Sequence, residues 1–139
     1  MAIALTEEMA RALDNALADR SPCLVATASA AGMPDVSYRG SVMVFDAEHL
    51  AFWERTKGET LENIRENPHV CVLYRNAETR VGWRFYGGAQ VLEDGDVRAQ
   101  IMERVNQFEL AQDPERTGYA VVVRVDRVRA RNETLMVRD

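Results

Sequence analysis

Lysine, histidine and cysteine are all scarce in this 139-residue chain, and each scarcity argues against a class of site. Lys57 is the only lysine, so arginine supplies nearly all of the 17 basic residues, and the net charge is −5. Because nucleic-acid binding needs concentrated cations, we expect no nucleic-acid partner, although a local anion site is compatible with this balance. The two histidines and two cysteines form no CxxC, HExxH or paired-histidine motif, so we expect no metal site.

Long apolar runs are also absent. No run approaches the roughly 20 residues of a membrane-spanning helix, and the N-terminus lacks a basic-then-apolar leader pattern. We therefore expect no membrane partner and a cytoplasmic protein. Cys23 and Cys71 lie in apolar, strand-like runs, where a buried reduced thiol is the expected state. With 47% hydrophobic and 28% charged residues, the chain suits a single domain over residues 1–139.

The hydrophobic periodicity predicts three helices and six strands. Helical spacing of apolar residues appears over 6–19, between Gly58 and Pro68, and over 95–111, where the stripe is Val97, Ile101, Val105 and Phe108. Strand patterns cover 23–29, 36–45, 50–55, 69–74, 81–92 and 119–131.

Three consecutive strands, with too few helices to cover both faces of a parallel sheet, indicate an antiparallel sheet. Six strands with glycine corners favour a small barrel over an open sheet. Gly40 and the pair Gly87–Gly88 mark bulges or close backbone approaches. The small side chains of Ala26, Ala28 and Ala30 would let a helix, a neighbour's backbone or a ligand pack closely.

A candidate ligand site lies where the third strand meets the second helix, in the segment WERTKGET from Trp53 to Thr60. Helix N-termini present unpaired N–H groups and a positive dipole end, and both favour a phosphate. Cations and hydroxyls for such an anion would come from Arg55, Lys57, Thr56 and Thr60. The alternative is a solvated loop followed by a helix surface, and Glu59, which would repel a phosphate, favours that alternative.

Arg39 is a charge in the middle of a strand, beside Gly40 and Ser41. Its side chain would reach the same anion or a ligand carbonyl, or it faces solvent from an edge strand. Trp83 and Arg84 could bracket a planar ring, although cross-strand packing explains Trp83 equally well. We find no Ser-His-Asp set, paired carboxylates or Walker-type loop, so no catalytic residue is named and a bound cofactor must supply any chemistry.

Four stretches resemble the pyridoxamine 5′-phosphate oxidase-related family of FMN-binding split-barrel proteins: CLVATASAAGMPDVSYRG, SVMVFDAEHLAFWERT, LENIRENPHVCVLYRN and WRFYGGAQVLE. LENIRENP followed by VCVLY is the most specific part, and the resemblance covers Pro22 to about Arg131. It implies a mainly β fold, a six-stranded antiparallel split barrel flanked by about three α-helices. It also implies a homodimer with FMN bound in clefts at the subunit interface.

The resemblance also implies which segments hold the cofactor. The second strand would supply Arg39, Gly40, Ser41 and Val42. The end of the third strand and the next loop would hold the ribityl chain and phosphate through Trp53, Glu54, Arg55, Thr56, Lys57 and Thr60. The strand with Trp83 and Arg84 would reach across from the partner subunit.

Three departures from the family's better-studied oxidases bear on the activity. Gly58-Glu59-Thr60 stands in place of a Ser-Arg-Lys phosphate cluster, and Val44 replaces a common lysine. The C-terminal ETLMVRD lacks the arginine- and histidine-bearing segment that grips pyridoxal phosphate. Arg55 and Lys57 are the candidates to replace the missing cations.

The expected function is therefore an FMN-dependent oxidoreductase that acts on another small molecule, with NAD(P)H as a candidate electron donor. Two alternatives stay open. One is a non-catalytic module that binds or senses flavin, deazaflavin or haem on the same dimeric barrel. The other is a dimeric scaffold whose cofactor site has decayed.

Overall fold

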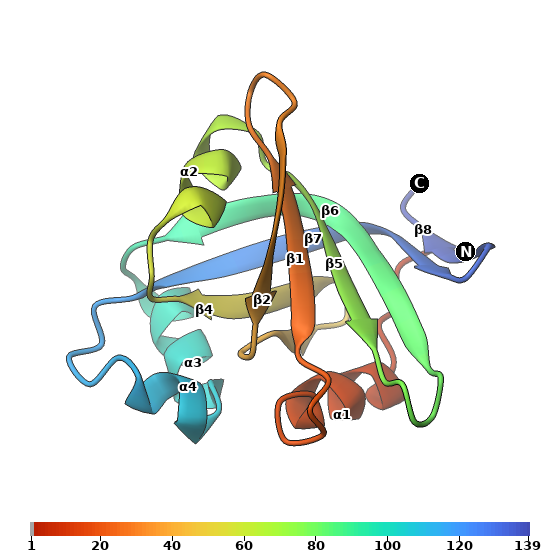
Figure 1. Cartoon of the computed structure of the whole chain (residues 1–139), viewed down its shortest axis with the longest axis horizontal. Coiled ribbons are helices and arrows are strands. Elements are labelled where there is room, and N and C mark those ends of the chain that lie inside the picture. The colour runs from red at the N-terminus through yellow and green to blue at the C-terminus, as the bar shows by residue number, and fades with distance from the viewer. Residues whose placement is uncertain (1) are drawn as a thin grey trace.

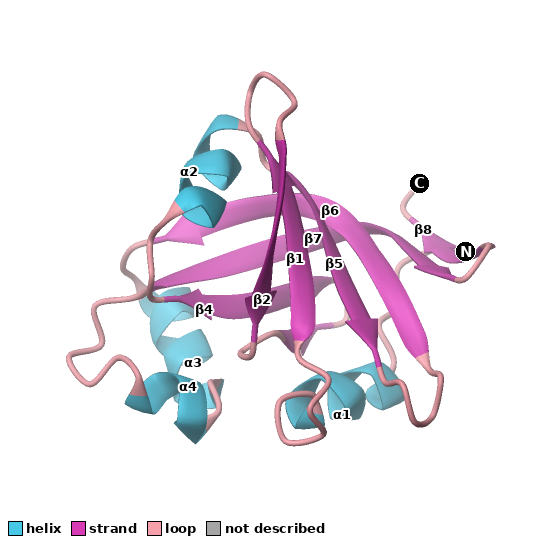
Figure 2. Cartoon of the chain, viewed as in Figure 1, coloured by secondary structure: helices cyan, strands magenta, loops and turns pink. Residues whose placement is uncertain are grey.

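The computed structural model describes residues 2–139 as one antiparallel sheet with four short helices around it (Figures 1 and 2). The strands are β1 (Cys23–Ala28), β2 (Pro34–Arg39), β3 (Met43–Asp46), β4 (His49–Glu54), β5 (His69–Arg75), β6 (Gly82–Leu92), β7 (Tyr119–Ala130) and β8 (Glu133–Val137). The helices are α1 (Glu7–Asn15), α2 (Glu59–Glu66), α3 (Asp96–Arg104) and α4 (Gln107–Ala111).

The sheet follows one path, β2-β1-β5-β6-β7-β4-β3, and β8 pairs with the far end of β7. Its two ends, β2 and β3, are consecutive in the chain, and only residues 40–42 separate them. No ladder joins β2 to β3 within the described part of the chain, so the sheet curls round without closing. This confirms the expected mainly β, antiparallel split barrel.

The long strand β7 connects the two halves of the sheet. One edge pairs with β6, while the other pairs with β4 through residues 119–124 and with β8 through residues 127–130. The β6–β7 register shifts between Tyr86 and Gly87. A Cβ atom on Gly87 would lie 2.0 Å from the carbonyl oxygen of Arg124, so this approach requires glycine. The bulge expected at Gly87–Gly88 is therefore confirmed.

The core has two parts. The larger cluster lies inside the curl of the sheet, where Met9 and Leu13 of α1 pack with strand residues such as Val72 and Phe85. Thr6 starts α1, because its hydroxyl accepts a hydrogen bond from the backbone N of Met9 at 3.1 Å. The smaller cluster lies under α3 and is made by Met43, Ala51, Trp53, Ile101, Val105 and Ala120.

The single strand expected over residues 36–45 is wrong, because the chain turns at Gly40-Ser41 and splits it into β2 and β3. The Ser41 hydroxyl accepts a hydrogen bond from the backbone N of Trp53 at 2.9 Å and donates to the Trp53 carbonyl at 3.4 Å. The Gly40 carbonyl accepts from the side-chain amide of Asn106 at 2.8 Å. These contacts stabilise the connection between β2 and β3, the two end strands of the sheet.

The single helix expected over residues 95–111 is also wrong, because it ends at Arg104 and restarts at Gln107. Asn106 has extended backbone (φ −62°, ψ 151°), and its side-chain oxygen accepts from the backbone N of Glu109, which starts α4. Of the expected apolar stripe, Ile101 and Val105 are buried, whereas Val97 and Phe108 are exposed. None of the helices in residues 2–139 is long and apolar enough to cross a membrane.

The C-terminal strand β8 was not expected, since ETLMVRD shows only a weak alternation. It forms by pairing with the last residues of β7, and Met136 is buried against the core. Residues 2–139 therefore form eight strands and four helices instead of the six and three that the sequence predicted.

Candidate functional site

The junction between β4 and α2 is built around Glu54, whose side chain is 0% exposed. Its Oε1 accepts from Arg39 Nε at 2.9 Å and pairs with Arg39 Nη2 at 2.8 Å. Its Oε2 accepts from the Thr56 hydroxyl and from the backbone N of Lys57, both at 2.8 Å. A buried carboxylate without partners would cost several kcal/mol. Here four donors satisfy it and tie loop 55–57 to the end of β4.

Arg39 extends this network to β2 and α2. Its Nη1 donates to the Ser37 hydroxyl at 3.0 Å and to the Tyr38 carbonyl at 2.7 Å. The Ser37 hydroxyl in turn lies 2.8 Å from the Thr60 hydroxyl, at hydrogen-bond distance. The sequence suggested an anion or solvent as the partner of Arg39, and the partner observed in the structure is Glu54. Of the expected cofactor residues, the structure brings together Arg39, Glu54, Thr56, Lys57 and Thr60.

Trp53, Ser41 and Val42 are buried within the protomer. The Trp53 indole N donates to Asp113 Oδ2 at 2.9 Å, and the Arg98 guanidinium lies 4.8 Å from the centre of its ring. Burial alone would raise the pKa of Asp113, but hydrogen bonds from Trp53, Gly118 and Thr117 outweigh it and lower that pKa. The observed role of Trp53 is thus to fasten β4 to the loop before β7.

The two cations expected at the junction contact groups outside the Glu54 network. Arg55 Nε lies 3.5 Å from Glu109 Oε2, and the Arg55 side chain is 39% exposed. Lys57 Nζ lies 4.0 Å from the centre of the Tyr119 ring, a cation–π contact that leaves its N–H donors available. Gly58 begins α2 without a side-chain cap, and the space beyond its Cα is open. The first backbone N–H groups of α2 therefore lie beside Lys57.

Acidic side chains surround the same helix start. Glu59 and Glu62 lie in the first turn of α2. A hydrogen bond with Asp35, together with repulsion from Asp35 and Glu62, raises the pKa of Glu59. The junction thus has amide, hydroxyl and ammonium donors that fit a phosphate in kind. Glu59, in the first turn of the helix, opposes one.

Trp83 and Arg84 lie apart from the junction. Trp83 is 6% exposed and stacks on Tyr74 with ring centres 5.5 Å apart, which confirms the cross-strand packing alternative. Arg84 is half-buried and donates to the backbone carbonyl of Arg131. Both lie at the hairpin end of β6, whereas α2 contacts β6 at its other end, near Ala89 (Figure 1). Within one chain, the structure does not bring them to Lys57.

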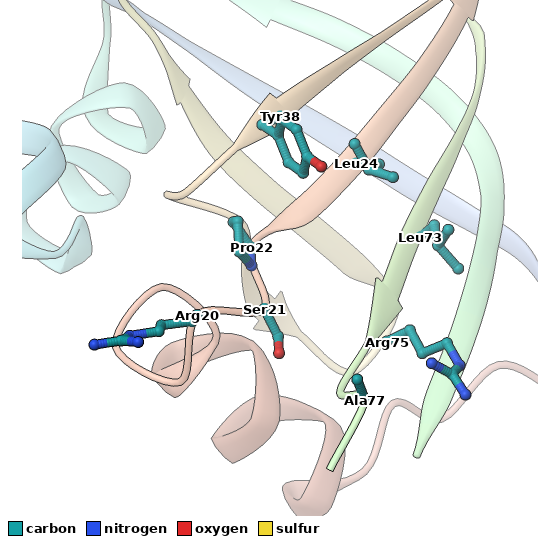
Figure 3. Close-up of a pocket in the computed structure, with 8 residues that line it drawn as sticks. All are labelled: Arg20, Ser21, Pro22, Leu24, Tyr38, Leu73, Arg75 and Ala77. Carbon is teal, nitrogen blue, oxygen red and sulfur yellow. The ribbon is translucent and has the colours of Figure 1, made fainter. Parts of the chain in front are cut away.

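The outer face of β2, β1 and β5 carries exposed apolar side chains that the sequence reading did not assign to a site. Val36 is 59% exposed and Tyr38 68%, and the register places Leu24 opposite Tyr38 and Leu73 opposite Leu24. A pocket of about 380 Å³ lies beside this face (Figure 3). Its lining residues are Arg20, Ser21, Pro22, Leu24, Tyr38, Leu73, Arg75 and Ala77. The available signal was the alternation in PDVSYR, which gives β2 one apolar and one polar face.

A larger groove, of about 840 Å³, lies at the hairpin end of β5 and β6 beside the turn between β7 and β8. Arginine is its most frequent lining residue. Of these arginines, only Arg84 was predicted from the sequence to be a site residue. The missed signal was two arginine-rich segments, RNAETR and RVRARN, which the antiparallel pairing of β6 with β7 brings to one place.

The antiparallel split barrel defines the architectural class, and comparison with known proteins identifies the family. The sequence model of pyridoxamine 5′-phosphate oxidase matches residues 8–132. An uncharacterised protein of Methanocaldococcus jannaschii is 30% identical over 128 residues, which are 91% of this chain and 80% of that protein. The chain belongs to the pyridoxamine 5′-phosphate oxidase family.

Solved structures agree with this assignment. A candidate pyridoxamine 5′-phosphate oxidase from Lactobacillus delbrueckii has a TM-score of 0.71 at 28% identity, over 91% of this chain and 94% of that chain. A pyridoxamine 5′-phosphate oxidase-related, FMN binding protein from Nostoc punctiforme has a TM-score of 0.68 at 14% identity, over 87% of this chain and 79% of that chain. The second likeness shows the fold alone.

Proposed function

We propose that this chain binds FMN as a homodimer and acts as a flavin-dependent oxidoreductase on a small molecule other than pyridoxamine phosphate. The observation that carries the proposal is the family match over residues 8–132, which includes both the β4–α2 junction and the outer face. The Nostoc punctiforme relative, which is named as FMN binding, supports the choice of cofactor.

The outer face supports the homodimer. Val36 and Tyr38 stand on β2, at one end of the sheet path, with Leu24 and Ala26 beside them on β1. Exposed apolar patches of this kind are typical of protein–protein contacts. A second copy of the chain would cover this face and the unpaired edge of β2, which removes an aggregation hazard.

The β4–α2 junction would hold the phosphate end of FMN. The first N–H groups of α2 would donate to phosphate oxygens, and the Lys57 ammonium would neutralise part of their charge. The Arg39–Glu54 pair would act indirectly, by holding loop 55–57 in place. Bound FMN supplies hydride acceptance and donation, chemistry for which this chain has no side-chain equivalent.

The absorption spectrum of the protein, recorded as purified and after incubation with FMN and gel filtration, tests the proposal. We expect retained flavin absorbance, a dimer by light scattering, and bleaching of the flavin band by NADH or NADPH under anaerobic conditions. Protein that stays colourless after incubation with FMN would refute the cofactor assignment. A monomer would refute the interface site.

A non-catalytic binding or sensing module is the second candidate. It is favoured by the extent to which the junction residues satisfy one another, since Arg39 and Thr56 are both engaged with Glu54. A yellow dimer that neither NADH nor NADPH reduces would support this candidate over the oxidoreductase.

A further inference from the structure

Five arginines line the groove at the hairpin end of β6: Arg75, Arg80, Arg84, Arg129 and Arg131. They come from two stretches of the chain, the β5–β6 hairpin (residues 75–84) and the end of β7 with the turn that follows it (residues 129–131). A protein with a net charge of −5 thus concentrates positive charge at one end of its sheet.

These charges have no carboxylate partners among the described residues. None of the five guanidinium groups lies within 4.0 Å of an Asp or Glu oxygen, although Glu8 and Glu133 border the same groove. Elsewhere, Arg39, Arg65 and Arg138 each pair with an acidic side chain at 3.2 Å or less. Six arginines outside the groove also lack a carboxylate partner within residues 2–139, so the groove is distinguished by having five such arginines together.

Two of the five side chains are held in place by backbone carbonyl groups. Arg84 donates to the carbonyl of Arg131, and Arg129 Nη2 donates to the carbonyl of Asn132 at 2.9 Å. Arg129 Nε is buried and has no hydrogen-bond partner within residues 2–139. A buried donor without an acceptor is costly, so a movement of the Arg129 side chain that brings Nε to an acceptor in the groove would be favourable.

We propose that this groove binds a small molecule that carries at least two anionic groups, either phosphates or carboxylates. Guanidinium groups recognise both through paired N–H donors, and five of them offer more donors than one phosphate can accept. The groove volume of about 840 Å³ lies within the range of small-molecule sites. Within one chain it lies apart from the β4–α2 junction, because the two are at opposite ends of β6 (Figure 1). In the proposed dimer, Trp83 and Arg84 would approach the cofactor of the partner subunit, so competition with FMN distinguishes a separate site from part of the cofactor cleft.

The backbone provides variants that should spare the fold. Arg80 and Arg131 occupy left-handed conformations, with φ of 62° and 54°. Asparagine tolerates this region better than arginine does. Arg80→Asn and Arg131→Asn therefore remove charge from the groove without a structural penalty, and they separate loss of binding from loss of folding.

The test is calorimetric titration of the full chain with inorganic pyrophosphate and, in a second arm, with citrate. Acetate at matched ionic strength controls for nonspecific screening. We expect saturable binding of at least one polyanion, weakened tenfold or more by Arg129→Gln and by the double variant Arg80→Asn/Arg131→Asn. Binding of only one of the two supports the site and assigns its class as phosphate or carboxylate.

The matched control is Arg124→Gln. Arg124 is exposed on β7 and does not line the groove, and its replacement by glutamine removes the same charge as Arg129→Gln. We expect this variant to bind within twofold of the wild type. Absence of saturable binding with both probes, or equal weakening by Arg124→Gln, would overturn the proposal. Thermal unfolding of each variant shows that it is folded before it is titrated.

A third arm distinguishes this site from the proposed cofactor site. The titration is repeated with FMN present, and the flavin spectrum is followed. Pyrophosphate that displaces FMN would overturn the assignment of a separate site, whereas binding without displacement supports it. The first two arms need no flavin, so protein that fails to bind FMN would leave their result intact.

Discussion

Replacing Arg39 by methionine tests whether the junction is held together as described. Glu54 is 0% exposed, and Arg39 supplies both donors to its Oε1, at 2.9 and 2.8 Å. Arg39→Met keeps much of the side-chain length but leaves a buried carboxylate without its cation. Removing one partner of a buried pair costs about 3–5 kcal/mol, so we expect a loss of that size in the free energy of unfolding.

The double variant Arg39→Met/Glu54→Met gives the matching control. It removes the carboxylate as well as the cation, so no uncompensated charge stays buried. The remaining loss comes from the Lys57 backbone N–H and the Thr56 hydroxyl, which no longer donate to Oε2. Thr56 is exposed, so its hydroxyl can donate to water instead, and only the Lys57 N–H is left unpaired. One unpaired donor costs roughly 1–3 kcal/mol, so the double variant should be more stable than Arg39→Met alone.

Urea unfolding followed by tryptophan fluorescence measures both losses, at one fixed protein concentration because a dimer makes stability concentration-dependent. A loss below about 1 kcal/mol for Arg39→Met would contradict a buried ion pair. A double variant less stable than the single one would contradict the charge argument. Unchanged stability combined with lost FMN binding would assign Arg39 to the cofactor instead.

The remaining predictions concern Glu59, Gly87 with Gly88 as its control, Asp113 and Cys23. Glu59→Gln should tighten FMN binding about threefold to tenfold, because it removes a negative charge near the proposed phosphate position; weaker binding in a fluorescence titration would contradict this. Gly87→Ala should lower the free energy of unfolding, measured in urea, by about 1–3 kcal/mol or more, because its Cβ would lie 2.0 Å from a carbonyl oxygen. Gly88→Ala should be nearly neutral in the same assay, because the space around its Cβ is open. Because the pKa of Asp113 is lowered in the fold, its stabilising effect is present above the ordinary value of 3.8 and is lost as pH falls through the lowered value. Acid unfolding should therefore begin at higher pH in Asp113→Asn, and an unchanged acid limb would contradict this. Burial raises the pKa of the Cys23 thiol to about 12, so a thiol reagent at pH 8 should modify it only as fast as the protein unfolds, and rapid labelling would refute its burial.

Local sequence signals were sufficient for most of the sheet. The alternation of β7 and the apolar run of β5 reflect how each strand is buried, and Thr6 starts α1 by a contact three residues away. The turn at Gly40-Ser41 was different, because its stabilising partners, Trp53 and Asn106, are distant in sequence. The alternation is interrupted at Gly40 and resumes after it, which predicted a bulge or close approach within one strand and not a turn.

The candidate site shows the same division. Most residues of the junction lie near one another in sequence. The exception is Arg39 of β2, which reaches Glu54 of β4 across the open side of the sheet. The partner of Arg39 depends on the order of strands in the sheet, which periodicity does not determine. The arginine groove was missed for the same reason, since Arg84 and Arg129 become neighbours only through the β6–β7 register.

The position of β7 in the chain has a consequence for synthesis of the protein. β7 is the pairing partner of one edge of β4 and of one edge of β6, and it begins about 65 residues after β4 ends. At a typical rate of roughly 5–20 residues per second, the edge of β4 stays unpaired for about 3–13 s while the chain is being made. Strand edges exposed for that long can pair with other nascent chains. We therefore expect truncations before Tyr119 to aggregate on expression, and recovery of the domain to depend on completion of its last 21 residues.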